Sequence, residues 1–314
     1  MTDPGEPDAQ AILVRAPGKI NLGLAVGPPG YDGYHPLRTV FQAVELFEDV
    51  RVRPAEQLSV SFTGPIDTGA LLGDTLVHRA ARVLATSFGL APNADISVLK
   101  RVPIAGGMGG GSADAAATLV ACNEAWKLDA DLDELHTIAA SLGADVPFAL
   151  YGGTRLGTGR GDQLIDVLTQ SRYTWVLVPD SEGLSTPKVY AELDRMRASG
   201  EASTTQLDTD PRIDTLLSAL RDGDPELLAA ALFNDLDAAA CSLRPELELT
   251  RLVGIEAGAL AALLSGSGPT MMLLAHDNQH ALEIQLAMRA SGIDTLVTHG
   301  PARGALFASA TATG

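Results

Sequence analysis

The segment from Pro103 to Ala117, PIAGGMGGGSADAAA, contains five glycines within the six positions 106–111 and leads directly into an alanine-rich stretch. Glycine has no Cβ, so successive backbone N–H groups can converge on one point without steric obstruction. A helix that starts there adds the positive end of its dipole. The segment therefore predicts an anion-binding loop, and we expect the anion to be phosphate.

Two other interpretations of the glycine loop are a flexible linker and a tight turn without a ligand. Linkers usually have Ser, Pro and charged residues on both sides, whereas VPIA precedes this loop and a helical pattern follows it. A tight turn needs one or two glycines rather than five. No Gly-Lys-Ser/Thr follows, and the spacing is not G-x-G-x-x-G, so any phosphate site belongs to another class.

The charge balance limits the partners of the chain. A formal net charge of −17 argues against nucleic acid or an anionic membrane as a partner, because both require a basic surface. A phosphate group would need local positive charge. Basic residues do occur in the half that contains the glycine loop, at Lys19, Lys100, Arg101, Arg155 and Arg160.

Other sequence features favour a cytoplasmic protein and suggest no metal site built on cysteines. The two cysteines, Cys122 and Cys241, suggest neither a disulfide framework nor a cysteine metal site. The segment 1–10 has no basic or apolar region typical of an export signal. His276 and His280 could chelate a metal from one helix face, but Asp277 as a helix cap is the interpretation we favour.

Periodicity along the chain predicts an α+β protein with a domain boundary near 160–170. Strands are expected at 11–16, 20–26, 37–52, 58–63, 95–102, 175–178 and 271–275. Helices are expected at 75–88, 112–126, 132–142 and 279–291. We therefore predict domains at 1–165 and 166–314. No function is assigned to the acidic region 198–226 or to the tail from Ala308.

Three separated motifs carry a family resemblance: APGKINL at 16–22, PIAGGMGGGSADAA at 103–116 and SGSGPT at 265–270. Together they resemble the GHMP kinase superfamily. The resemblance implies a two-domain fold in which an N-terminal domain binds ATP at the glycine loop. A smaller C-terminal α/β domain completes a cleft that holds the small-molecule substrate.

The resemblance also implies catalytic and nucleotide-binding residues. Lys19 and Asp145 match the catalytic lysine and aspartate, although an ion pair that only joins two segments is the alternative. Asp145 lies in the apolar segment LGADVPF, a setting that suits a general base. Lys100 is interpreted either as a contact on the adenine side or as a solvated surface lysine. The expected ATP-binding residues are Lys100, Pro103, Ile104, Ala105, Gly106, Gly107, Met108, Gly109, Gly110, Gly111, Ser112 and Ala113.

The segments DGYHPLRTVFQ at 32–42 and LGADVPF at 142–148 narrow the resemblance to one branch of the superfamily. That branch phosphorylates the 2-hydroxyl of a cytidyl diphosphate sugar alcohol in non-mevalonate isoprenoid synthesis. Stacking of the pyrimidine between two tyrosines is implied, because flat aromatic faces suit a base. The expected substrate-binding residues are Asn21, Tyr34, His35, Thr186 and Tyr190.

Alternatives remain within and outside this class. A mevalonate-type or homoserine-type kinase and a catalytically silent nucleotide sensor share the same motifs. The chain departs from the family pattern at Thr75 and at Ala113-Asp114, which affects the adenine and ribose contacts. Mg²⁺ is expected to accompany ATP, its protein ligands are not identified, and the chain is expected to be a monomer or weak homodimer.

Overall fold

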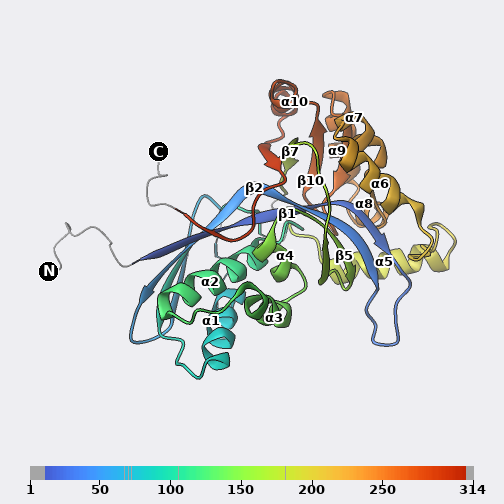
Figure 1. Cartoon of the computed structure of the whole chain (residues 1–314). Coiled ribbons are helices and arrows are strands. Elements are labelled where there is room, and N and C mark those ends of the chain that lie inside the picture. Colours follow the sequence, from blue (N-terminus) through green and yellow to red (C-terminus); the bar gives the residue numbers. More distant parts are fainter. Residues whose placement is uncertain are drawn as a thin grey trace.

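The computed structural model describes residues 11–66, 68–69, 71, 73–104, 106–180 and 182–308. Two sheets form the framework (Figure 1). The larger sheet contains β1 (Ile12–Val26), β2 (Leu37–Pro54), β3 (Ser59–Thr63), β4 (Ala94–Leu99), β5 (Thr154–Gly159), β6 (Gln163–Asp166), β8 (Phe233–Asn234) and β12 (Leu306–Phe307). The smaller, antiparallel sheet has the order β11 (Leu296–Gly300), β7 (Tyr173–Val178), β10 (Met271–Ala275) and β9 (Ala261–Leu264).

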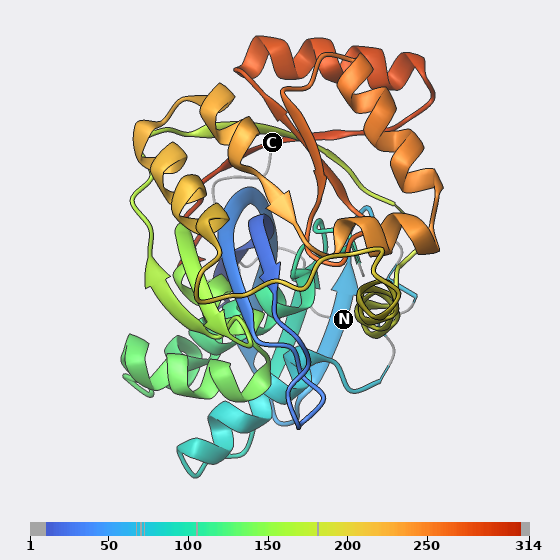
Figure 2. The same ribbon diagram turned by 90° about the vertical axis from the view of Figure 1, so that its right-hand side faces the viewer.

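Helices cover the outer sides of these sheets (Figures 1 and 2). The helices of the first half are α1 (Leu76–Ser87), α2 (Gly110–Trp126), α3 (Leu132–Leu142) and α4 (Asp145–Tyr151). Those of the second half are α5 (Thr186–Ala198), α6 (Pro211–Asp222), α7 (Pro225–Ala231), α8 (Asp237–Leu243), α9 (Glu246–Glu256) and α10 (Asn278–Ala290). The α+β class predicted from the sequence is confirmed. No helix in the described ranges is long and apolar enough to cross a membrane.

The two sheets face each other through a shared apolar core. Ile20 and Val40 of the larger sheet and Trp175 and Met272 of the smaller one belong to the same buried cluster. The Trp175 indole N–H also donates a 3.0 Å hydrogen bond to the Gln42 side chain, so the one polar atom of this large ring is satisfied. Burial of this face fixes how the two halves are placed, and with it the cleft between them.

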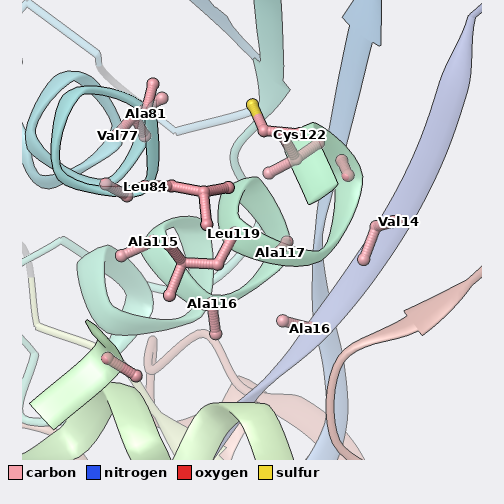
Figure 3. Close-up of a cluster of buried hydrophobic side chains, with 14 of the residues drawn as sticks. Val14, Ala16, Val77, Ala81, Leu84, Ala115, Ala116, Ala117, Leu119 and Cys122 are labelled. Carbon is pink, nitrogen blue, oxygen red and sulfur yellow. The ribbon is translucent and has the colours of Figure 1, made fainter. Parts of the chain in front are cut away.

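Helix α2 lies against the larger sheet and orients the glycine loop. Its small side chains, such as Ala115, allow close approach to α1 on one side and to β1 on the other (Figure 3). Leu119 contributes the larger apolar side chain and is fully buried. Because α2 is alanine-rich and packed on both sides, its N-terminal end holds a fixed position.

Strand β1 differs from its expected form. The sequence predicts two strands interrupted at Pro17-Gly18, and that prediction is wrong, because β1 is continuous from Ile12 to Val26. Its pairing with β2 shifts register between Pro17 and Gly18. Such an irregularity accommodates a proline, which has no N–H to give to the ladder. The continuous strand carries Lys19 and Asn21 into the molecule.

The expected boundary at 165/166 stays a prediction. Strand β6 ends at Asp166 and β7 of the second sheet begins at Tyr173. Strands β8 and β12 return from the second half to pair with β1. Of the tail that begins at Ala308, residues 309–314 lie outside the described residues.

Candidate active site

Lys19 connects the first motif to the glycine loop. Its backbone N–H donates a 2.9 Å hydrogen bond to the Met108 carbonyl, and its side chain is buried. Gly109 adopts φ +69°, and a Cβ built there would lie 3.2 Å from Lys19 Cγ and 3.9 Å from Asp145 Oδ2. Glycine at 109 thus gives the chain its left-handed turn and leaves room between the loop and the two predicted catalytic side chains.

A directional chain of hydrogen bonds orients the Lys19 ammonium. The Thr39 hydroxyl donates to the Gly23 carbonyl at 2.8 Å, so it accepts from the Asn21 amide N–H at 2.8 Å. The Asn21 carbonyl oxygen is then left to accept from Lys19 Nζ at 2.7 Å. Since residues two apart in a strand share a face, β1 places Lys19 and Asn21 on the same side.

Burial and the Asp145 carboxylate shift the pKa of Lys19 in opposite directions. Removal from water lowers the pKa of the Lys19 ammonium below its usual value, and the negative charge of Asp145 partly opposes this effect. Asp145 is the first residue of α4 and is half-buried. The pair therefore couples a desolvated ammonium to a carboxylate beside the loop.

A pocket of about 200 Å³ gathers these groups between the two halves of the chain. Residues from all three motifs and from the later segments line it. They are Lys19, Asn21, Leu24, Leu37, Thr39, Phe41, Gly107, Gly109, Asp145, Arg160, Thr186, Tyr190, Leu236, Gly266 and Ser267. Lys19 and Asp145 were predicted as a pair from segments more than one hundred residues apart, and both line this pocket.

The third motif packs against the glycine loop. The Ser265 hydroxyl donates a 3.3 Å hydrogen bond to the Gly107 carbonyl, and Thr270 N donates to the Gly106 carbonyl at 3.3 Å. The hydroxyls of Ser267 and Thr186, at the start of α5, are 2.8 Å apart. Segments from both halves therefore form one wall of the pocket.

His35 and Tyr190 meet at the margin of the pocket. Their ring centroids are 5.0 Å apart, and His35 Nε2 lies 3.0 Å from Asp194 Oδ1. Burial, together with the negative charge of Asp145, raises the pKa of Tyr190 to about 12, so the phenol is protonated at neutral pH. Tyr190 and Asp145 line the same pocket.

Tyr34 is farther out, in the loop before β2. It is 57% exposed, and the Arg160 guanidinium lies 3.8 Å from the centre of its ring. Arg160 also pairs with Asp32 at 2.9 Å. Of the predicted substrate residues, Asn21, Thr186 and Tyr190 line the pocket, His35 contacts Tyr190, and Tyr34 contacts the pocket residue Arg160.

The glycine loop differs from expectation at the helix start. The helix was expected from Ser112, but α2 begins at Gly110 with Gly109 as its cap residue, so Ser112 lies within the first turn of the helix. The first backbone N–H groups of a helix have no partner within the helix, so those at the start of α2 are potential donors to an anion. Pro103, Ile104 and Ala113 flank this turn, while Ala105 lies outside the described residues.

The position of the Lys100 side chain agrees with neither of the two roles expected for it. It is 1% exposed, and its ammonium donates to Glu48 Oε1 at 2.6 Å and to Asp114 Oδ2 at 2.7 Å. It is therefore not a solvated surface lysine, and its charge is not directed at a nucleotide. Two buried carboxylates attract the ammonium more strongly than a distant ligand could.

Two of the other basic residues named from the sequence also have carboxylate partners. Arg101 pairs with Asp49 at 2.8 Å and Arg155 with Asp166 at 2.7 Å. The sequence did not identify Thr39, Phe41, Gly266 and Ser267 as pocket residues, although all four lie in segments that carried the family resemblance.

Asp277, which lies between His276 and His280, forms the helix cap favoured from the sequence. His280 Nδ1 accepts a hydrogen bond from the His276 backbone N–H, and Asp277 caps α10 as expected by accepting from His280 N. Within the described ranges, no group of three or more His, Cys, Asp or Glu side chains is placed to hold a metal ion.

Comparison with protein families and curated proteins gives consistent matches. Residues 75–153 match the GHMP kinases N terminal domain, and residues 216–294 match the GHMP kinases C terminal model. A 4-diphosphocytidyl-2-C-methyl-D-erythritol kinase of Leifsonia xyli subsp. xyli is 48% identical over 94% of this chain and 98% of its own length. The kinase of that name from Mycolicibacterium gilvum is 47% identical over 96% of this chain and 94% of its own.

Solved structures agree with these matches. A crystal structure of 4-(cytidine 5'-diphospho)-2C-methyl-D-erythritol kinase aligns with TM-score 0.73 at 30% identity, over 93% of this chain and 100% of that one. A homoserine kinase from Cytophaga hutchinsonii aligns with TM-score 0.75 at 19% identity, over 98% and 100%. The second match shows the fold alone.

Proposed function

Because this chain belongs to the 4-diphosphocytidyl-2-C-methyl-D-erythritol kinase family of GHMP kinases, we propose that its pocket phosphorylates the 2-hydroxyl of that cytidyl substrate. The chain is an ATP-dependent small-molecule kinase by family. The single observation that carries the proposal is the convergence of Lys19, Asp145 and the glycine loop on one pocket with Tyr190.

Asp145 is proposed as the general base and Lys19 as the group that stabilises charge. The 2-hydroxyl oxygen attacks the γ-phosphorus of ATP, its proton moves to the Asp145 carboxylate, and the bond to the β-phosphate oxygen breaks to release ADP. The Lys19 ammonium, fixed through Asn21, offsets the negative charge on the transferred group. Burial strengthens this effect because less water screens the charges.

The glycine loop and the start of α2 are proposed to hold the ATP phosphates. Backbone N–H groups of 106–112 and the helix dipole attract the phosphate oxygens. Mg²⁺ bound to nucleotide phosphates needs only one or two protein oxygens. The Ser112 hydroxyl, in the first turn of α2, fits that limited requirement. When bound, Mg²⁺ would neutralise phosphate charge and so lower the barrier to transfer.

The cytidyl end is proposed to lie at Tyr34, His35 and Tyr190. The His35–Tyr190 contact and the exposed Tyr34 face provide aromatic surfaces on one side of the pocket. Asn21 and Thr186, which line the interior, would contact the sugar-alcohol hydroxyls. A cytoplasmic location, a monomer or weak homodimer, and domains at 1–165 and 166–314 also stay predictions.

A coupled assay tests the proposal by measuring ADP release with ATP, Mg²⁺ and the cytidyl substrate. Mevalonate and homoserine serve as matched controls, since both are alcohols that lack a cytidyl group. We expect turnover with the cytidyl substrate, with a kcat/KM at least roughly 10³-fold above that of either control. The reason is that binding of the cytosine base, far from the reacting hydroxyl, helps to orient that hydroxyl for transfer. Failure of the cytidyl substrate to react, with turnover of a control, would assign the pocket to a sister kinase.

A further inference from the structure

A buried charged cluster lies beneath the glycine loop and has no place in the proposed chemistry. It consists of Glu48 on β2, Lys100 just after β4 and Asp114 on α2. Their side chains are 0%, 2% and 5% exposed. With all three groups ionised, the cluster has one net negative charge, an arrangement that a stable core does not require.

Glu48 holds the chain that enters the glycine loop. Its Oε2 accepts a 2.9 Å hydrogen bond from the Arg101 backbone N–H. Its Oε1 accepts from the Val102 backbone N–H at 3.2 Å as well as from Lys100 Nζ. Both oxygens are therefore used as acceptors, a pattern that a carboxylate satisfies and a carboxamide cannot.

The same cluster holds the helix that leaves the loop. Lys100 Nζ bridges Glu48 Oε1 to Asp114 Oδ2, and Asp114 lies in the second turn of α2. The α2 backbone also meets Glu48 directly, since a Cβ built at Gly110 would lie 3.1 Å from Glu48 Oε1. One carboxylate thus contacts the residues on both sides of the loop.

We propose that Glu48 is a positioning residue for nucleotide binding. It holds the backbone of residues 101–102 directly and is connected to Asp114 through Lys100, so it sets the separation between the two ends of the phosphate loop. Glu48 does not touch the nucleotide. It acts through the backbone N–H groups of the loop, whose convergence on a phosphate requires both loop ends to be fixed. This proposal rests on the proposed ATP site.

The matched variants are Glu48→Gln and Asp114→Asn, which each replace a buried carboxyl group with a carboxamide. Glu48→Gln places an NH₂ group where Arg101 N or Val102 N needs an acceptor, so it breaks the clamp. Asp114→Asn can keep the acceptor for Lys100, because Asp114 Oδ1 has no hydrogen-bond partner and can become the NH₂ position. An effect of charge alone would move both variants in the same direction.

Two measurements on the full chain test the clamp. Calorimetric binding of the non-hydrolysable analogue AMP-PNP with Mg²⁺ should weaken about tenfold in Glu48→Gln and less than twofold in Asp114→Asn, because one buried hydrogen bond is lost only in the first. Amide hydrogen exchange of 106–112, measured without nucleotide, should be faster in Glu48→Gln only. If Glu48→Gln does not fold, Glu48→Asp, which withdraws the oxygens by one methylene, replaces it with the same expectation.

The outcomes separate the clamp from the proposed function. Unchanged loop exchange in the Glu48 variant, or equal shifts in both variants, overturns the clamp. Faster loop exchange in the Glu48 variant supports the clamp as a structural device. If the unaltered chain then fails to bind AMP-PNP, the ATP site is overturned, and with it the role of the clamp in nucleotide binding.

Discussion

Lys19 Nζ donates a 2.7 Å hydrogen bond to Asn21 Oδ1, two residues further along the same strand. The bond connects the proposed catalytic ammonium to a chain of donors and acceptors that ends at the Gly23 carbonyl. Because each link has a defined donor, the carbonyl of Asn21 must face Lys19. The neutral amide therefore fixes the lysine without supplying a second negative charge beside Asp145.

Replacing the neutral partner with a charged one should change the pH dependence of turnover. In Asn21→Asp, a carboxylate next to Lys19 raises its pKa, which burial lowers in the unaltered chain. The alkaline limb of the kcat profile should then move to higher pH by about one unit, since a close opposite charge shifts a pKa by about 1–3 units. An alkaline limb that stays in place would show that Lys19 does not govern it.

Asp145→Asn should remove turnover while nucleotide binding remains. The substitution keeps the shape of the side chain but removes the proton acceptor, and we expect kcat to fall by about 10²–10⁴-fold. Single-turnover kinetics and AMP-PNP binding measure the two effects separately. Asp133→Asn, on the exposed first turn of α3, is the control and should leave both unchanged. Retention of kcat in Asp145→Asn would exclude the base role.

Tyr34→Ala should raise KM for the cytidyl substrate about tenfold and leave KM for ATP unchanged, because a stacked aromatic face is worth about 1–3 kcal/mol per base. Tyr34→Phe keeps the face and should behave like the unaltered chain. Tyr31→Ala is the matched control, since Tyr31 is in the same loop and fully exposed. Equal effects of Tyr31→Ala and Tyr34→Ala would indicate a change in the loop rather than loss of stacking.

Gly266 offers a test of crowding at the Lys19–Asn21 bond. It adopts φ +60°, and a Cβ there would lie 3.2 Å from Asn21 Oδ1 and 3.4 Å from Lys19 Nζ. Gly33 adopts φ +78° with open space around it. Both Gly→Ala changes should therefore lower the free energy of unfolding by about 1–2 kcal/mol through backbone strain. Only Gly266→Ala should also lower kcat, by roughly tenfold, and equal kcat losses in both would argue against crowding.

The sequence predicted the groups that belong to motifs and missed those that depend on packing. Lys19, Asp145 and Tyr190 were named from local segments and a family resemblance, and the pocket contains all three. Lys100 was misinterpreted because its partner Glu48 is 52 residues away in the chain. One signal was available, since Glu48, Val50 and Val52 alternate along β2 on its buried face. A glutamate at a strand position whose neighbours on the same face are buried and apolar indicates a buried carboxylate with a partner.

The predicted strand break at Pro17 was wrong for a related reason. A proline cannot donate a hydrogen bond at a regular position of a sheet, but a strand can continue through it where the register shifts. Only the pairing with β2 shows that β1 continues in this way. The helix start moved from Ser112 to Gly110 because glycine, a weak helix former in general, is favoured here by close approach to Glu48 and Val102. In each case a tertiary contact decided what local propensity left open.

Titration of Glu48 should make stability depend on pH in a way that Glu48→Gln abolishes. Burial, with the nearby charge of Asp114, raises the pKa of Glu48 to about 7, although Lys100 opposes the shift. Between pH 4.5 and 7 the native state then binds more protons at this site than the unfolded state, so stability falls as pH rises across that window. Urea unfolding at pH 5 and pH 7.5 should show the unaltered chain losing up to about 3 kcal/mol relative to Glu48→Gln. Parallel pH profiles for the two proteins would mean that Glu48 ionises at its ordinary pKa in the folded chain.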